Sequence, residues 1–439
     1  MSFKQLFSRS LSADPTRLHF AAHSHHLWPD ASFDGQREAW EDAATLADRK
    51  WDKVMGEVWP EAQGHVAREL GTGQPEAVGF SSNTHDFLLR LVTAAPRGGT
   101  GPLRVLTTDG EFHSARRQFA RWQEEGWIAV ERVPAEPFDD LPQRFLERAG
   151  SGEHDFIFVS QVLFANGRIV DRIAELAALG RQGGPWVVID GYHAFMAIDR
   201  PFGEQAARTA FYLGGGYKYA MAGEGCAFMH APSGFGPRPP ITGWYAEFED
   251  LRLPPGSVGY AEDASRFLGA TFDPSGLYRF NAIQRLLAAN GLTTARVSAH
   301  CEALRFQLLA GLDRTPLASA ELLNPLGGQP HARFLAFRSP QAQRWYEALK
   351  ARNCITDVRG EVLRIGFGIY QDEGDVDRLV RLLGELKSPM PTSCGAAPPS
   401  CSAFCSSPTS SIISTGRSSA SLPAQSSPSF SSATANSAR

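Results

Sequence analysis

A continuous apolar run that ends in a carboxylate limits what this chain can fold into. Trp186–Ile189 is entirely apolar and is followed at once by Asp190, with His193 three residues further on. A second apolar run, Ala210–Leu213, leads into three glycines, a tyrosine and Lys218. Continuous apolar runs are typical of strands buried in a parallel sheet, and ligands bind where such strands end. We therefore expect Asp190 and Lys218 to face one pocket at neighbouring strand ends.

Strand-like runs alternate with helical patterns between about residues 75 and 230. The strand-like runs are Leu103–Thr107, Ile128–Val133, Phe156–Ser160, Trp186–Asp190, Ala210–Leu213 and Cys226–His230. Helical patterns such as Ser114–Glu125 and Asp171–Arg181 lie between them. This alternation predicts an α/β domain with a mainly parallel sheet.

The chain after residue 240 predicts a second, smaller α/β unit. Two helical patterns, Leu277–Asn290 and Thr293–Leu312, come first. The elements expected after them are a strand at Arg333–Arg338, a helix at Gln341–Arg352, two short strands around Ile355 and Leu363, and a helix at Asp375–Leu386.

The composition changes abruptly at about Lys387. Residues 388–439 are rich in Ser, Ala and Pro and contain no Asp or Glu. Such a segment cannot bury enough apolar surface to offset its ordering entropy, so we predict a disordered tail. A translated frameshift would have the same composition, and both interpretations stay open. Cys394, Cys401 and Cys405 lie in this tail without the fourth ligand that a metal site needs.

The overall composition is that of a soluble globular protein and argues against several other classes. The 439 residues are 43% hydrophobic and 21% charged, with a net charge of -4 at pH 7. This balance gives no general attraction to nucleic acid or to an anionic membrane. No apolar run is long enough to span a bilayer, and the N-terminal MSFKQLFSRSLSADP lacks an apolar signal core. Six cysteines in so long a chain do not form a disulfide framework, so we expect a cytoplasmic protein with reduced thiols.

An acid and a lysine that face one pocket are the pair that pyridoxal 5'-phosphate (PLP) requires. The lysine forms a Schiff base with the aldehyde of this cofactor. The carboxylate keeps the pyridine nitrogen protonated, so that the ring can act as an electron sink. Asp190 and Lys218 are the candidates for these two roles.

Two motifs carry a resemblance to a known enzyme family. The segments D-G-Y-H (190–193) and G-G-Y-K-Y-x-x-x-G-E-G (215–225) resemble the class V aminotransferase superfamily of fold-type I PLP enzymes, and kynureninase most of all. The resemblance implies that Asp190 pairs with the pyridine nitrogen, His193 supports the ring, Tyr217 bonds the phosphate and Lys218 carries the cofactor. It covers about residues 15–387. The parts that it implies are an N-terminal segment over the active site (1–30), a large PLP-binding domain (31–290) with a mainly parallel sheet, a small C-terminal α/β domain (291–387) and the tail (388–439).

A phosphate site is expected where small polar residues precede an apolar helix. Free N–H groups at the start of a helix bind phosphate without a dedicated cation. In this family the cup for the phosphate lies at the position of Asn83, Thr84 and His85. The ordinary alternative is an N-cap by Ser82 or Asn83.

The resemblance implies further cofactor contacts. Phe112 matches the phenylalanine that stacks on the cofactor in kynureninases, and Gln161 is expected near the 3-oxygen of the ring. Trp244 and Thr271 match residues that reach the active site of the partner subunit, so a homodimer with shared active sites is expected. Kynureninases carry an aspartate three residues after the phenylalanine, whereas this chain has Ala115.

The expected substrate is an α-amino acid. Arg364, in a run that resembles the C-terminal signature of the superfamily, matches the arginine that clamps the α-carboxylate, a task that suits the planar fork of a guanidinium. His23 and Ser24 are substrate-pocket candidates from the N-terminal segment. The neighbouring His25 and His26 also permit a metal site, but no supporting pattern of Cys or acidic residues follows, and no metal is expected.

The resemblance favours a kynureninase-like enzyme that cleaves a Cβ–Cγ bond by hydrolysis. A class V aminotransferase and a non-catalytic PLP-binding regulator are the alternatives. Cysteine desulfurases share the fold but need a mobile nucleophilic cysteine before the arginine. Cys354 stands in an apolar, strand-like segment instead, which favours a buried small hydrophobe.

Overall fold

A seven-stranded sheet with the strand order β2-β8-β7-β6-β5-β3-β4 forms the larger layer of the structure. The structure, a computed structural model, describes residues 2–247, 256–327 and 330–386. The strands are β2 (Val78–Ser81), β3 (Leu103–Thr108), β4 (Ile128–Val133), β5 (Phe156–Ser160), β6 (Trp186–Asp190), β7 (Ala210–Gly215) and β8 (Ala227–His230). Neighbouring strands pair in parallel except at β8, which is antiparallel to both of its neighbours. The predicted mainly parallel sheet is therefore confirmed.

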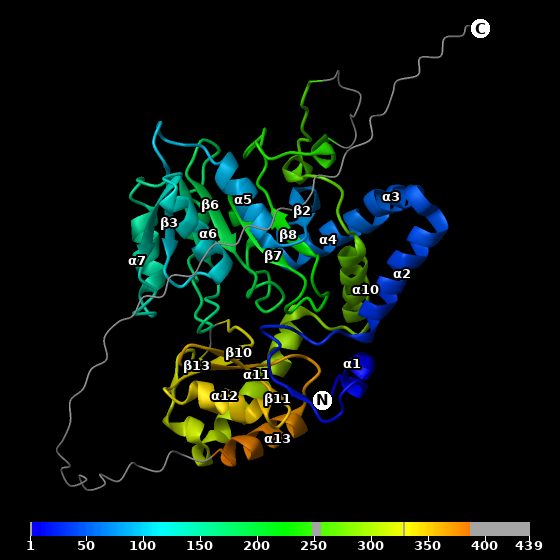
Figure 1. Ribbon diagram of the computed structural model, residues 1–439, viewed down its shortest axis with the longest axis vertical. Coiled ribbons are helices and arrows are strands. Elements are labelled where there is room, and N and C mark those ends of the chain that lie inside the picture. Colours follow the sequence, from blue (N-terminus) through cyan, green and yellow to red (C-terminus); the bar gives the residue numbers. More distant parts are fainter. Residues whose placement is uncertain (1, 248–255, 328–329, 387–439) are drawn as a thin grey trace, which may run out of the picture. The chain divides into compact units, whose positions relative to one another are not determined.

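Helices pack on this sheet through the apolar stripes that the sequence gives them (Figure 1). They are α5 (Thr84–Ala94), α6 (His113–Glu124), α7 (Leu141–Ala149), α8 (Ile173–Ala177) and α9 (Gly203–Ala207). The helix expected over Asp171–Arg181 is much shorter than predicted. It ends because the N–H of Gly180 turns back to the carbonyl of Ala177 at 3.0 Å, and the N–H of Arg181 bonds to Pro185.

A smaller antiparallel sheet, of order β12-β13-β10-β9, follows later in the chain. Its strands are β9 (Glu321–Leu322), β10 (Phe334–Arg338), β12 (Asp357–Arg359) and β13 (Val362–Gly366), and the helices around it are α11 (Thr294–Ala310), α12 (Ala342–Lys350) and α13 (Glu373–Gly384). The sequence predicts two short strands here, whereas the structure has three because β11 (Cys354–Ile355) separates from β12 and pairs in parallel with β1 (Leu18–His19). The N-terminal segment is thereby tied to this part of the fold.

Long helices from distant parts of the sequence lie side by side next to the large sheet. Figure 1 shows α10 (Ser275–Ala289) alongside α2 (Asp30–Leu46), with α4 (Trp59–Leu70) nearby. Two short helices, α1 (Ser8–Ser12) and α3 (Lys50–Lys53), complete this region. The approach of α10 to α2 depends on Gly35, since a Cβ there would lie 2.6 Å from the carbonyl oxygen of Tyr278.

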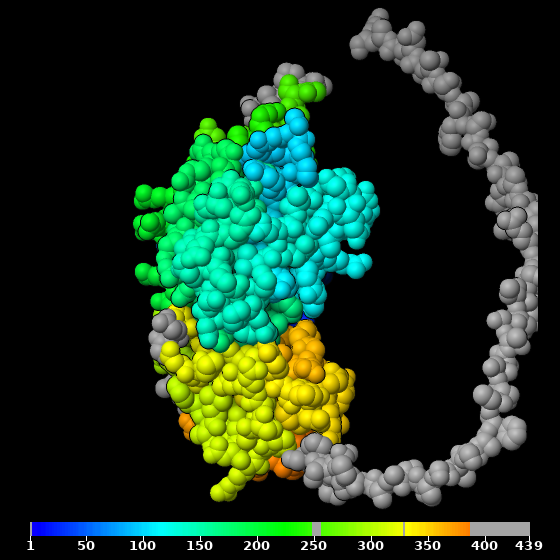
Figure 2. All heavy atoms as spheres, turned by 90° about the vertical axis from the view of Figure 1, so that its left-hand side faces the viewer, coloured from blue at the N-terminus to red at the C-terminus, as the bar shows by residue number. Residues whose placement is uncertain are grey.

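One face of the small sheet packs against loops of the large one. Figure 2 shows the surface of this later part of the chain (yellow) directly against that of the large-sheet region (cyan). Phe334 and Ala336 of β10 join Val162 and Ala194 in one apolar cluster. At the edge of this contact Arg338 forms an ion pair with Glu136 at 2.5 Å. Register pairs Ala336 with Arg364 and places both on this same face.

No helix in the described ranges is long and apolar enough to cross a membrane. The predicted tail, residues 388–439, lies outside the described residues. The expected boundaries of the N-terminal segment and of the two domains stay predictions, since residues 1–388 form one compact unit.

Candidate active site

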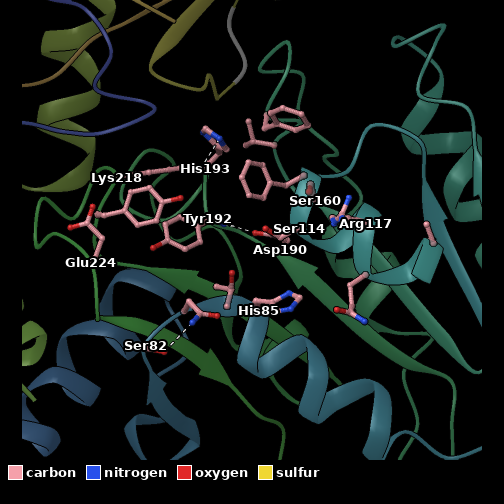
Figure 3. Close-up of a pocket in the computed structure, with 18 of the residues that line it drawn as sticks. Ser82, His85, Ser114, Arg117, Ser160, Asp190, Tyr192, His193, Lys218 and Glu224 are labelled. Carbon is pink, nitrogen blue, oxygen red and sulfur yellow. Dashed lines mark hydrogen bonds between the residues drawn. The ribbon is translucent and has the colours of Figure 1, made fainter. Parts of the chain in front are cut away.

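A pocket of about 860 Å³ opens at the carboxyl ends of the parallel strands (Figure 3). The strands β3, β5, β6 and β7 run in the same direction and therefore end at one edge of the sheet. The lining includes Asn83, Thr84, His85, Phe112, Ser160, Phe164, Asp190, Tyr192, His193, Tyr217 and Lys218. The structure thus brings together the acid and the lysine that the sequence places at neighbouring strand ends.

Lys218 is a buried lysine without a carboxylate ion pair of its own among the described residues. Its Nζ lies 2.8 Å from Nε2 of His193 and 4.8 Å from the centre of the Tyr192 ring. Burial lowers the pKa of Lys218 to about 7, although the charge of Asp190 acts in the opposite direction. At neutral pH about half of the molecules therefore carry Lys218 as an unprotonated amine. This form can act as a nucleophile or a base.

Asp190 ends β6 and faces the same pocket. Its Oδ1 accepts a hydrogen bond from the backbone N–H of Tyr192 at 3.0 Å. Burial raises the pKa of this carboxyl, and both the Tyr192 bond and the charge of Lys218 oppose that shift. A cationic group placed in the pocket would stabilise its ionised form.

Two rings complete the surroundings of Lys218. Burial holds the pKa of His193 well below its usual range, so this imidazole is neutral, and its Nδ1 has no hydrogen-bond partner within the described ranges. Tyr217 packs against Tyr192 with a centroid distance of 4.8 Å and stacks on His25 at 5.4 Å. Burial raises the pKa of Tyr217 to about 12, so its phenol stays protonated and can donate a hydrogen bond.

The N-terminus of α5 opens into the pocket. Asn83 caps this helix, because its side-chain oxygen accepts a hydrogen bond from the N–H of Asp86 at 3.0 Å. Thr84 and His85 stand in the first turn and line the pocket, and Nδ1 of His85 is buried with no partner in the described part of the chain. The N-cap and the predicted anion site are compatible, since the cap uses one N–H and leaves others exposed to the pocket.

Aromatic side chains form one wall. Phe112 and Phe164 meet edge to face with a centroid distance of 5.4 Å. Ala115, where kynureninases carry an aspartate, is buried in a core cluster with Phe119 and does not line the pocket. This departure from the family pattern therefore affects the core behind α6 more than the pocket.

Arg364 lies next to this pocket and is 2% exposed. Its Nη2 donates to Oδ2 of Asp357 and its Nη1 donates to the carbonyl of Phe164. Oδ1 of the same aspartate accepts a bond from Nη1 of Arg359 at 2.6 Å. Nε of Arg364 is buried and has no hydrogen-bond partner among residues that the structure describes. The charges of both arginines help to lower the pKa of Lys218, which places them close to the pocket.

The histidines of the N-terminal segment do not converge on one point. His23 is fully buried and stacks on Phe334 at 4.6 Å, with its Nε2 3.8 Å from Oδ2 of Asp357. His25 stacks on Tyr217, whereas Nδ1 of His26 bonds to the carbonyl of Leu27 at 2.7 Å. Within residues 2–247, 256–327 and 330–386, no three His, Cys, Asp or Glu side chains group as metal ligands.

Six predicted site residues are not brought into the pocket lining, and Arg364 and His23, described above, are two of them. Gln161 uses both ends of its amide elsewhere, since Tyr212 donates to its Oε1 at 2.7 Å and its Nε2 donates to Pro201 at 2.8 Å. In this structure both polar atoms of the Gln161 amide are therefore engaged, and its contact with a ring oxygen stays a prediction. Ser24, Trp244 and Thr271 also stand outside the lining.

Sequence reasoning missed several residues that the structure places at the site, among them Tyr192 and Glu111. Tyr192 lies within the D-G-Y-H motif, and its position between Asp190 and His193 is the signal that could have identified it. Glu111 is 1% exposed and lies behind Ser160. A lone acid in a loop gives no sequence signal of its own, because its burial depends on β5.

Comparisons with known proteins identify the fold. No protein-family model and no curated protein matches the chain. The apo cysteine desulfurase from Thermococcus onnurineus NA1 is 16% identical, with 88% of this chain and 99% of that chain covered and a TM-score of 0.68. A variant of C-DES with glycine covalently linked to its PLP cofactor is 16% identical, with coverages of 86% and 98% and a TM-score of 0.72. The cysteine desulfurase CsdA from Escherichia coli is 14% identical, with coverages of 86% and 96% and a TM-score of 0.69. The likeness confirms the predicted fold-type I architecture.

Proposed function

We propose that this chain is a PLP-dependent enzyme that acts on an α-amino acid. The observation that carries the proposal is the buried Lys218, with a pKa of about 7, which shares one pocket with the half-buried carboxyl of Asp190. A lysine that is about half unprotonated at neutral pH is suited to attack an aldehyde. The similar structures support this proposal, since one of them holds PLP.

The residues present fit the groups that PLP carries. The aldehyde would meet Nζ of Lys218. The protonated ring nitrogen would be a cationic partner for the carboxylate of Asp190 and would stabilise its ionised form. The first turn of α5 offers N–H groups for the phosphate, and the protonated phenol of Tyr217 offers a further donor. Nδ1 of His193, buried without a partner in the described chain, is available for a hydrogen bond to bound groups.

Bound PLP would supply an aldehyde for covalent attachment of an amino group and a ring that withdraws electrons from Cα. Nζ of Lys218, with its lowered pKa, would accept the Cα proton of a substrate as a general base. The same atom, once protonated, can return that proton. Arg364 would hold the α-carboxylate through its remaining N–H groups, since each Nη nitrogen uses one of its two N–H groups for Phe164 or Asp357 and Nε has no partner in the described chain.

For the specific reaction, we propose hydrolytic cleavage of a Cβ–Cγ bond, as in kynureninase. The aromatic wall of Phe112, Phe164 and Tyr192 supports it, since these rings offer stacking surface to an aromatic side chain. Amino transfer by a class V aminotransferase is the alternative that shares every site residue. A non-catalytic PLP-binding regulator is less well supported, because it would need neither the general base Lys218 nor the buried Arg364.

Cysteine desulfuration is poorly supported by the described cysteines. Cys226, Cys301 and Cys354 are all buried, and burial raises the pKa of each thiol. A nucleophilic thiol in this role must be accessible and ionisable.

A homodimer with shared active sites is part of the proposal. Trp244 is 41% exposed on the short helix η5 (Trp244–Glu247), and Thr271 is exposed as well. Both stand outside the pocket of their own chain. An exposed tryptophan is a common anchor for a partner surface.

The test is to load the purified protein with PLP, reduce it with borohydride and locate the modified lysine by mass spectrometry. We expect one pyridoxyl group, on Lys218, and none in Lys218→Ala. Lys53→Ala, which removes a lysine from a surface ion pair, is the matched control and should still be labelled. A pyridoxyl group on any other lysine would overturn the assignment. Incubation with kynurenine, 3-hydroxykynurenine and a panel of amino acids with keto acids then separates hydrolysis from amino transfer.

A further inference from the structure

A second buried carboxyl, which the proposed chemistry does not use, lies directly behind the pocket. Glu111, in the loop between β3 and α6, is 1% exposed. Its Oε1 accepts a hydrogen bond from Oγ1 of Thr108 at 2.6 Å. Its Oε2 accepts two bonds from Ser160, one from the backbone N–H at 3.0 Å and one from Oγ at 2.5 Å. The carboxyl is therefore held by hydroxyl and amide donors.

Ser160 connects this carboxyl to the pocket. It is the last residue of β5 and lines the pocket together with Asp190. Ser160 and Asp190 are partners in the parallel register of β5 and β6, so their side chains project to the same face of the sheet. Figure 3 shows both side chains at the pocket wall. The Ser160 hydroxyl is thus the link between Glu111 and the wall that holds Asp190.

Glu111 ionises in the neutral range. Burial raises its pKa from 4.5 to about 7, the bonds from Ser160 and Thr108 oppose this shift, and the charge of Asp190 adds to it. Thr108 comes from β3, Ser160 from β5 and Asp190 from β6, and Asp190 is the charged group among them. Ser160 lines the pocket and its hydroxyl bonds to Glu111, so Glu111 can exchange its proton with water in the pocket through this hydroxyl.

We propose that Glu111 is a positioning residue that acts on the pocket through the hydroxyl of Ser160. When Glu111 is ionised, the hydroxyl donates to Oε2 and its proton points away from the pocket. When Glu111 is protonated, the carboxyl donates to Oγ of Ser160, and the hydroxyl proton turns toward the pocket beside Asp190. The gain or loss of one proton behind the wall thereby changes a donor inside the pocket. Its effect on a bound cofactor rests on the proposed function, whereas the coupling of Glu111 to Ser160 does not.

The first experiment measures unfolding of the cofactor-free protein in urea between pH 5 and 8. Because folding raises the pKa of Glu111, this carboxyl binds more protons in the folded state than in the unfolded state, so its contribution to stability falls as pH rises. The contribution of Glu111 to the folding equilibrium constant should fall by roughly 30- to 100-fold over this range. Glu111→Gln should remove this contribution, and the control Glu147→Gln, at an exposed position of α7, should not. A difference between wild type and Glu111→Gln that is constant with pH would overturn the proposal.

Ser160→Ala tests the link. Without the hydroxyl the ionised form of Glu111 loses a donor, so its pKa should rise and the pH dependence of stability should steepen. The same substitution in the Glu111→Gln background should leave the pH dependence unchanged. Equal effects in both backgrounds would show that Ser160 and Glu111 are not coupled and would overturn the proposal.

The last arm uses PLP as the probe. The visible absorbance of the bound cofactor should change with a midpoint near pH 7 in wild type, and Glu111→Gln should abolish or shift that midpoint. An unchanged midpoint would show that Glu111 does not act on the pocket. If wild type binds no PLP, the proposed function fails, and the two cofactor-free measurements decide the role of Glu111 alone.

Discussion

The guanidinium of Arg364 is paired with the carboxylate of Asp357 in the interior, opposite it in the register of β12 and β13. Oδ1 of the same carboxylate holds Arg359 at 2.6 Å. Two cations therefore share one anion, and the cluster carries one net positive charge, which suits the arrival of one substrate carboxylate. Asp357 holds Arg364 in place, and Arg359 gives Asp357 a second partner.

Arg364→Lys should reduce kcat/KM strongly and leave the absorbance of bound PLP near normal. A compact ammonium cannot reproduce the geometry of the guanidinium fork. Loss of a charge-assisted pair costs about 1.5–3 kcal/mol, which is roughly ten- to a hundredfold in kcat/KM. Steady-state kinetics with the best substrate measures the effect. Arg338→Lys, on the neighbouring strand β10, is the control and should behave as wild type. An unchanged kcat/KM for Arg364→Lys would exclude the carboxylate role.

Asp357→Asn should destabilise the protein because it leaves buried Arg364 without a counter-charge. Breaking a buried ion pair from one side costs about 3–5 kcal/mol. Urea unfolding measures the loss. The double variant Asp357→Asn/Arg364→Met should recover part of it, since no buried charge then remains unpaired. If the single variant is as stable as wild type, the pair does not hold this region together.

Much of the fold could be predicted because its strands are buried on both faces. The bounds of β4, β5 and β6 match the prediction to the residue. β5 and β6 are continuous apolar runs with a sharp polar end, whereas β4, at the edge of the sheet, contains Glu131 and Arg132. β2 was missed because it has only four residues, one of them Gly79, and pairs with the distant strand β8. Such a strand depends on a distant segment and carries no pattern of its own.

The site residues at the ends of strands could be predicted. Residues whose place depends on which side of a strand they face, or on contacts with distant segments, could not. Lys218 and Asp190 meet because β6 and β7 are parallel neighbours. Successive residues of a strand face opposite sides, so Ser160 lines the pocket while Gln161 faces Tyr212. The sequence analysis assigned Gln161 to the cofactor, which stays a prediction, whereas the residue that lines the pocket is Ser160.

Gly366→Ala should disturb the buried N-terminal histidine. A Cβ at residue 366 would lie 2.0 Å from Nδ1 of His23, which is itself packed on Phe334 and has no room to retreat. Overpacking of this kind costs about 1–3 kcal/mol. Gly64→Ala in α4 is the control: no atom lies within 4 Å of its added Cβ, so it should gain about 0.5–1 kcal/mol. Thermal unfolding compares the two, and equal stability would show that His23 is free to move.

Cys354→Ala should keep turnover. Cys354 is fully buried in β11, and burial raises the pKa of its thiol to about 12, so it cannot serve as a nucleophile. Loss of the sulfur leaves a small cavity and costs stability alone. Alanine release from kynurenine and sulfide release from cysteine are the two assays. Sulfide release that disappears in Cys354→Ala would move the enzyme to the desulfurase class.

The rate of covalent attachment of PLP should rise with pH through about 7 and level off above it. Only the unprotonated amine of Lys218 attacks an aldehyde, and burial lowers the pKa of that amine to about 7. The charge of Asp190 raises this pKa, so Asp190→Asn should move the midpoint to lower pH. Stopped-flow absorbance between pH 5.5 and 9 records the rates, and Glu147→Gln serves as the control for removal of a distant carboxylate. A midpoint that remains near that of a free lysine in wild type, or that rises in Asp190→Asn, would contradict the electrostatic account of this site.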